Sequence, residues 1–87
     1  MSIITVDVKD LSIIVKGRTG PRAKVLGYGG LGFKWDRDRN RWRGRLTLFN
    51  LRILSKWPEV ILSNEARQAI EEFEQAQAKR EAHMAIA

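Results

Sequence analysis

Residues 31–46 alternate apolar and basic side chains around a polar turn, and this pattern constrains the fold more than any other feature of the sequence. The apolar members share a parity within each arm: Phe33 and Trp35 before the turn, and Trp42, Leu46 and Leu48 after it. Successive side chains of a strand point to opposite faces, so the basic residues between them take the other face. The turn at 36–40 is rich in Asp and Asn, which favour chain reversal. The stretch therefore predicts a β-hairpin with one apolar and one cationic face.

The net charge of +6 on these 87 residues is distributed unevenly along the chain. Residues 16–45 contain ten basic residues and two acids, whereas residues 59–87 contain three basic residues and six acids. A concentrated basic patch is the electrostatic signature of a protein that binds a polyanion, and nucleic acid is the commonest polyanion in a cell. The middle of the chain therefore predicts a DNA-binding surface.

The expected contacts to nucleic acid come from the hairpin and from the segment that precedes it. They are Lys34, Arg37, Arg39, Arg41, Arg43, Arg45, Lys24, Arg22 and Tyr28. Alternate residues of a strand lie roughly 6.5–7 Å apart, which is comparable with the phosphate spacing along a nucleic-acid strand. Whether the DNA is single-stranded, forked or duplex stays open.

Two alternatives to DNA binding remain at this point. The hairpin arginines could pair with Asp36, Asp38 and the acidic last helix, which would leave a solvated strand face. The cationic face could also dock an acidic protein, which would make the chain a small phage or regulatory interaction module. Trp35 and Trp42 are expected in the core because a small domain needs their large apolar area, with base stacking as the alternative role.

The remaining sequence predicts further elements around this hairpin. We expect strands at 3–9 and 11–17, a short helix from Pro21 to about Leu26, a helix at 48–56, an edge strand at 60–62, and a last helix capped by Ser63 or Asn64. The fold class is then α+β, a small antiparallel sheet of two β-hairpins with two or three packed helices. Large apolar residues nearly vanish after Phe73, so residues 1–75 are expected to form one domain and residues 76–87 a helical extension or connector.

The predicted core combines apolar residues from all of these elements. It contains Ile4, Val6, Ile13, Val15, Leu26, Phe33, Trp35, Trp42, Leu46, Leu51, Leu54, Ile70 and Phe73. A chain of this length buries only a modest fraction of its surface. We therefore expect a single small core and no large catalytic cavity.

The sequence gives little support to an enzyme, a metal site or a cofactor. Cysteine is absent and His83 is the only histidine, most simply a surface residue, so no zinc site and no catalytic set can be assembled. The glycine cluster at 27–32 precedes a strand, whereas a phosphate loop precedes a helix. No apolar run approaches the roughly 20 residues of a membrane span. We expect a cytoplasmic protein, associated with the nucleoid if it binds DNA.

A family resemblance adds to this interpretation. The runs Arg22-Ala23-Lys24-Val25-Leu26, Leu31-Gly32-Phe33-Lys34-Trp35-Asp36 and Arg39-Asn40-Arg41-Trp42 follow one pattern. The pattern resembles that of the HARP domains of annealing helicases and of related N-terminal modules in phage and bacterial DEXH-box, Swi/Snf-type helicases. The resemblance implies an accessory DNA-binding domain that lies before a helicase motor, with substrate recognition by the basic surface. This chain itself carries no motor motif.

Overall fold

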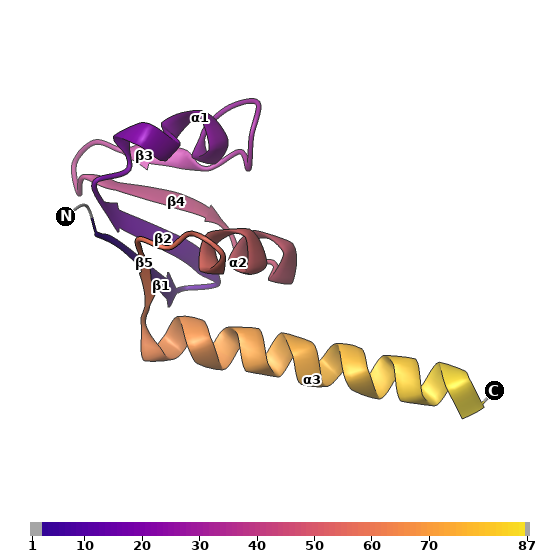
Figure 1. Ribbon diagram of the computed structural model, residues 1–87. Helices are drawn as coiled ribbons and strands as arrows, with labels where there is room; N and C mark the ends of the chain where they lie inside the picture. Colours follow the sequence, from indigo (N-terminus) through magenta and orange to yellow (C-terminus); the bar gives the residue numbers. More distant parts are fainter. Residues whose placement is uncertain (1–2, 87) are drawn as a thin grey trace.

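The computed structural model describes the backbone of residues 3–86 and the side chains of residues 3–79. Its strands are β1 (Ile4–Lys9), β2 (Ser12–Gly17), β3 (Lys34–Asp36), β4 (Arg41–Arg45) and β5 (Val60–Leu62). Its helices are the 3₁₀ turn η1 (Gly20–Arg22), α1 (Ala23–Leu26), α2 (Leu48–Ser55) and α3 (Asn64–Ile86). Figure 1 shows a twisted sheet with helices packed against it. The predicted α+β class is confirmed.

The sheet has the strand order β3-β4-β2-β1-β5. Both predicted hairpins are present, since β1 pairs with β2 and β3 pairs with β4 in antiparallel register. The hairpins join through β2 and β4, which are also antiparallel. The fifth strand adds a parallel edge beside β1, so the complete sheet is mixed. After α2 the chain returns to the opposite edge of the sheet from β3, and there it runs in the same direction as β1.

A two-residue turn closes the first hairpin. Lys9 pairs with Ser12, and the two residues between them, Asp10 and Leu11, have φ angles of 53° and 61°. Positive φ at both central positions is the signature of a type I′ turn, whose twist matches that of the strands it joins. The predicted strand boundaries at this hairpin are correct to within one residue.

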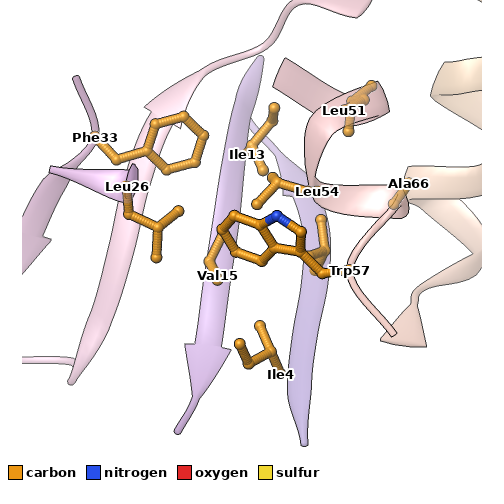
Figure 2. Packing of buried hydrophobic residues seen from close by; sticks show 10 residues of the cluster. Ile4, Ile13, Val15, Leu26, Phe33, Leu51, Leu54, Trp57 and Ala66 are labelled. Atoms are coloured by element: carbon orange, nitrogen blue, oxygen red, sulfur yellow. The ribbon is translucent and has the colours of Figure 1, made fainter. Parts of the chain in front are cut away.

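All the helices pack against one face of the sheet. Ile4 and Val6 of β1 and Ile13 and Val15 of β2 are fully buried on this face. They form one cluster with six residues from the rest of the chain: Leu26 of α1, Phe33 before β3, Leu51 and Leu54 of α2, Trp57, and Ala66 of α3 (Figure 2). The second face of the sheet carries mainly polar and charged side chains, and no described helix packs on it.

Most of the predicted core is confirmed. Trp42, Leu46, Ile70 and Phe73 are partly buried against the central cluster, and the other predicted members apart from Trp35 are buried. Trp35 is 46% exposed, so its assignment to the core is wrong. The reason is its place on β3, a three-residue strand at the edge of the sheet. Its ring meets that of Trp42 edge-on at a centroid distance of 5.4 Å, and Trp42 rather than Trp35 contacts the core.

Gly44 of β4 lies in the strand at a position whose side chain would face the helices. The ring of Phe33 lies directly over it. A Cβ atom at this position would collide with the Phe33 ring. Glycine in a strand often marks such a close approach. The missing side chain therefore makes room for the buried aromatic ring that closes this end of the core.

Side-chain caps mark the start of two helices, and one of these caps also attaches its helix to the sheet. The Oγ1 atom of Thr47 accepts a hydrogen bond of 3.1 Å from the backbone N–H of Asn50 at the start of α2. Ser63 does the same for α3, accepting from the backbone N–H of Ala66 at 3.1 Å, and its hydroxyl donates to Oδ1 of Asp7 at 2.7 Å. Ser63 is thus the cap predicted at Ser63 or Asn64, and it also fixes the start of α3 to β1.

The helix α3 has 23 residues and extends past the sheet (Figure 1). Ala66 is buried, whereas Ala69, Ile70 and Phe73 of the predicted apolar stripe are partly buried. From Glu74 to Lys79 the side chains are exposed. The elongation of the molecule, with extents of 48 × 25 × 23 Å, is mainly due to this helix.

Candidate nucleic-acid interface

The helix-free side of the sheet, here called the open face, carries most of the cations of the two hairpins. Strand register assigns to it the following residues: Thr5, Asp7, Lys9, Ser12, Ile14, Lys16, Lys34, Asp36, Arg41, Arg43, Arg45 and Ile61. Six of them are basic and two are acidic. The strand periodicity of two is the cause, since each of these residues alternates with one that faces the helices.

The open face brings together cations from four neighbouring strands. Arg43 of β4 is paired with Lys34 of β3 on one side and with Ile14 of β2 on the other. Arg41 and Arg45 lie on the same side of β4, two residues away in each direction. Lys9 and Lys16 come from β1 and β2, near opposite ends of the first hairpin. Cations from four adjacent strands therefore share one face of the sheet, around the apolar Ile14.

Ile14 lies at the centre of the open face and is only 4% exposed, although no described helix covers it. Its register neighbours are Asp7 and Arg43. Long basic side chains bury their aliphatic stems along apolar surface while the charged ends stay in water. We infer that the stems of the surrounding arginines and lysines cover Ile14. Such packing limits their rotation and holds their charges above the sheet.

Arg41 is the most enclosed cation of the open face, with its side chain 11% exposed. Its Nε atom lies 3.6 Å from Oδ2 of Asp36, which is too long for a hydrogen bond. Within the described part of the chain this Nε atom is buried and has no hydrogen-bond partner. The guanidinium is therefore oriented by a nearby carboxylate while its hydrogen-bonding capacity is not used up.

Three shallow hollows lie along the open face. The first, of about 340 Å³, is lined by Lys9, Lys16 and Arg41 together with Thr5, Asp7, Ile14 and Ser63. A second, of about 180 Å³, brings Arg39 of the hairpin turn beside Lys9, Arg41 and Arg43. The third, of about 420 Å³, lies between Lys34, Arg43 and Arg45 and reaches Leu11. Each hollow has at least three cationic side chains on its wall.

The open-face cations are only weakly neutralised within the molecule. Among the described residues, the ion pairs are Arg22–Glu59, Arg41–Asp36 and Arg52–Glu74, so just one of them involves the open face. Arg43 Nε donates a hydrogen bond of 3.1 Å to Ser12 Oγ. No ion pair of the described part joins the hairpin to α3. The alternative interpretation expected the arginines to pair with Asp36, Asp38 and the last helix. In the described part of the chain only Arg41 forms such a pair, with Asp36.

The predicted contact residues do not all lie on the open face. Lys34, Arg41, Arg43 and Arg45 belong to it, and Arg39 adjoins it through the second hollow. Arg37 is exposed in the turn of the second hairpin. By contrast, Lys24 lies on α1 and Tyr28 in the turn after it, both exposed. Since α1 packs on the opposite face of the sheet, these two residues are separated from the basic surface.

Arg22 has a structural role in the fold. Its Nε donates to Oε1 of Glu59 at 2.7 Å, and its guanidinium carbon lies 4.6 Å from the ring centroid of Trp57. The hydrogen bond from Arg22 is the main reason why the pKa of Glu59 lies below its ordinary value. Arg22 thus joins the segment before α1 to the segment before β5, and its role in DNA binding stays a prediction.

Two cations of the open face, Lys9 and Lys16, were missed by the sequence interpretation. The signal was present, because Lys9 has the parity opposite to Ile4, Val6 and Val8, and Lys16 the parity opposite to Ile13 and Val15. The strand order supplies the missing information. It places β2, not β1 or β5, beside the arginine-rich strand β4.

The aromatic side chains of the two hairpins lie on the helix-bearing side. Trp42 donates a hydrogen bond of 2.9 Å from Nε1 to Oγ1 of Thr19, which fixes its ring at the edge of the core. Trp35 packs against it on the same face. The open face, as defined above, contains no aromatic residue. It can therefore contact phosphates with cations, but it offers no platform for stacking unpaired bases.

The described residues form neither a metal site nor a membrane-spanning helix. No group of three or more His, Cys, Asp or Glu side chains in that part is arranged to hold a metal ion. The side chain of His83, predicted to be a surface residue, lies outside the described side chains. Among the described helices, none combines the length and the apolar character needed to cross a membrane.

Comparisons with protein-family models, with curated proteins and with solved structures returned no match for this chain.

Proposed function

We propose that this chain binds DNA by placing the phosphate backbone on the open face of its sheet. The observation that carries the proposal is the gathering of six cations and two acids on one helix-free face, with a single ion pair among them. Uncompensated cations raise the free energy of a compact protein by mutual repulsion, and an anionic ligand relieves it. DNA supplies phosphates at regular spacing, and binding releases its counterions.

The dimensions of the open face favour contact with a duplex. Neighbouring strands lie about 4.8 Å apart, so the cations from β3 to β1 span roughly 14 Å, comparable with the roughly 12 Å width of the major groove. Along β4, Arg41, Arg43 and Arg45 are spaced by roughly 6.5–7 Å each. Cations thus extend in two directions, which suits phosphates of more than one strand. The missing aromatic residues weigh against a preference for unpaired bases.

The resemblance to HARP domains suggests a cellular context for this activity. In those helicases the accessory domain lies before a motor and engages the DNA that the motor acts on. We propose the same arrangement here, with the present chain as the substrate-binding module and a helicase motor as its partner.

Fluorescence anisotropy with duplex, single-stranded and forked DNA at several salt concentrations tests the proposal. We expect the Arg43→Ala, Arg45→Ala double variant to bind unrelated sequences equally weakly, because phosphates carry no base identity. Each lost contact with a duplex should reduce the slope of log affinity against log salt by roughly 0.9. Folding should change by about 1 kcal/mol or less, since both side chains are exposed and only the stem contacts over Ile14 are lost.

A matched control is Arg52→Ala. Arg52 lies on α2, and its Nη2 atom is 3.9 Å from Oε1 of Glu74, away from the open face. Arg52→Ala removes one positive charge, against two in the double variant, and should retain most of the affinity, whereas Arg43→Ala alone, which also removes one, should not. Absence of binding to every DNA at low salt would overturn the proposal. Equally tight binding of polyaspartate would instead favour the acidic-protein partner.

A further inference from the structure

Leu11 at the tip of the first hairpin has an unusual combination of properties. It is the second central residue of the type I′ turn, with a φ angle of 61°, and its side chain is 84% exposed. Such left-handed positions are normally occupied by glycine, which has no Cβ atom to clash, or by asparagine, whose short side chain can hydrogen-bond locally. Leucine there strains the backbone, and its exposure means that core burial does not offset this strain.

The surroundings of Leu11 are cationic. The hollow of about 420 Å³ on the open face has Leu11 at one end and Lys34, Arg43 and Arg45 along its wall. An apolar side chain therefore projects from the sheet next to three positive charges. If the phosphates of a polyanion contacted these charges, the part of the ligand next to its phosphates would lie against Leu11. In duplex DNA that part includes the stack of base pairs, which is apolar.

We propose that Leu11 inserts between neighbouring base pairs when duplex DNA lies on the open face. This inference rests on the proposed function and adds a substrate class and an action, namely duplex DNA that is locally unstacked and kinked. Leucine is among the apolar residues with which DNA-bending proteins open base steps. The backbone strain fits such a role, because strained residues persist where function requires a side chain at a particular place.

A second hollow also reaches Leu11 and defines the competing explanation. It has a volume of about 280 Å³ and lies between Leu11, Leu46 and Phe73, with Ala69 and Glu72 completing its wall. This groove would suit an apolar protein segment. The cations around the other side of Leu11 favour DNA, and a protein contact through Leu11 becomes an outcome of the test.

The test uses duplex DNA with a 2-aminopurine at a central position, whose fluorescence rises when the base is unstacked, and a second duplex with dyes at both ends to report bending. The full chain should raise the fluorescence several-fold at saturation and shorten the end-to-end distance. Leu11→Gly should bind with an affinity within about threefold of the parent, because the cations remain, but should lose most of both signals. Leu11→Met, which keeps a long apolar side chain, should retain them.

The outcomes separate this inference from the proposed function. If Leu11→Gly binds and still unstacks the base, the wedge is overturned and DNA binding stands. If the parent chain binds no duplex at low salt, both are overturned. Sedimentation of the protein without DNA measures self-association. If Leu11→Gly abolishes self-association but gives the same 2-aminopurine signal as the parent, Leu11 belongs to a protein contact and the wedge is overturned. Circular dichroism checks that each variant is folded.

Discussion

The two faces of the sheet have the same backbone but opposite chemistry. On the helix-bearing face, side chains from β1 and β2 meet three helices and are removed from water. On the open face the same strands present lysines and arginines, and Ile14 is the single large apolar residue at its centre. The first face accounts for the stability of the fold. Most cations of the second face are exposed to water and lack a carboxylate partner among the described residues, which is why we look to a ligand to explain them.

The largest loss of folding stability is expected for substitutions on the helix-bearing face. Trp57→Ala should lower the free energy of unfolding by roughly 3–5 kcal/mol, because it removes a buried ring of the central cluster and the surface on which Arg22 lies. Urea unfolding measures the loss. DNA affinity per folded molecule should not change, and a parallel loss of both would show that the two faces are not independent.

Gly44 and Arg43 offer the same comparison within two adjacent residues of β4. Gly44→Ala should cost roughly 1–3 kcal/mol, because the new Cβ displaces the Phe33 ring from its place in the core. Arg43→Ala, whose side chain points the other way and is exposed, should cost about 1 kcal/mol or less, because it removes only the stem contacts over Ile14. Thermal or urea unfolding of the two variants gives the difference. Equal losses would contradict the assignment of their faces.

The smallest expected effect is the pH dependence of the Arg22–Glu59 pair. Since the pKa of Glu59 is lowered from its ordinary value of 4.5, the pair stabilises the fold above that pH. This stabilisation is lost as the pH falls through the lowered pKa. The difference in unfolding free energy between the parent and Glu59→Gln should therefore shrink under acid conditions. A difference that stays constant down to about pH 3 would contradict the role of this pair.

The elements were predictable from the sequence because their signals are local. Alternation marked both hairpins, Pro21 and Gly27 bounded the short helix, and a serine marked the start of α3. The exposure of Trp35 was missed because it depends on β3 being the edge strand. The inclusion of Lys9 and Lys16 in the open face was missed because it depends on strand order. Both are relations between distant segments, which parity within one strand does not contain.

The hydrogen bond between Ser63 and Asp7 has a mechanical consequence. It attaches the first residues of α3 to β1, the strand that also carries part of the open face. A helix of 23 residues is about 34 Å long and resists bending. The helix is therefore a stiff rod that is attached to the sheet at its first turn. A protein or domain bound to the C-terminal half of α3 would therefore rotate together with the sheet and with a ligand on the open face. Its motion would be transmitted through the helix without a flexible linker.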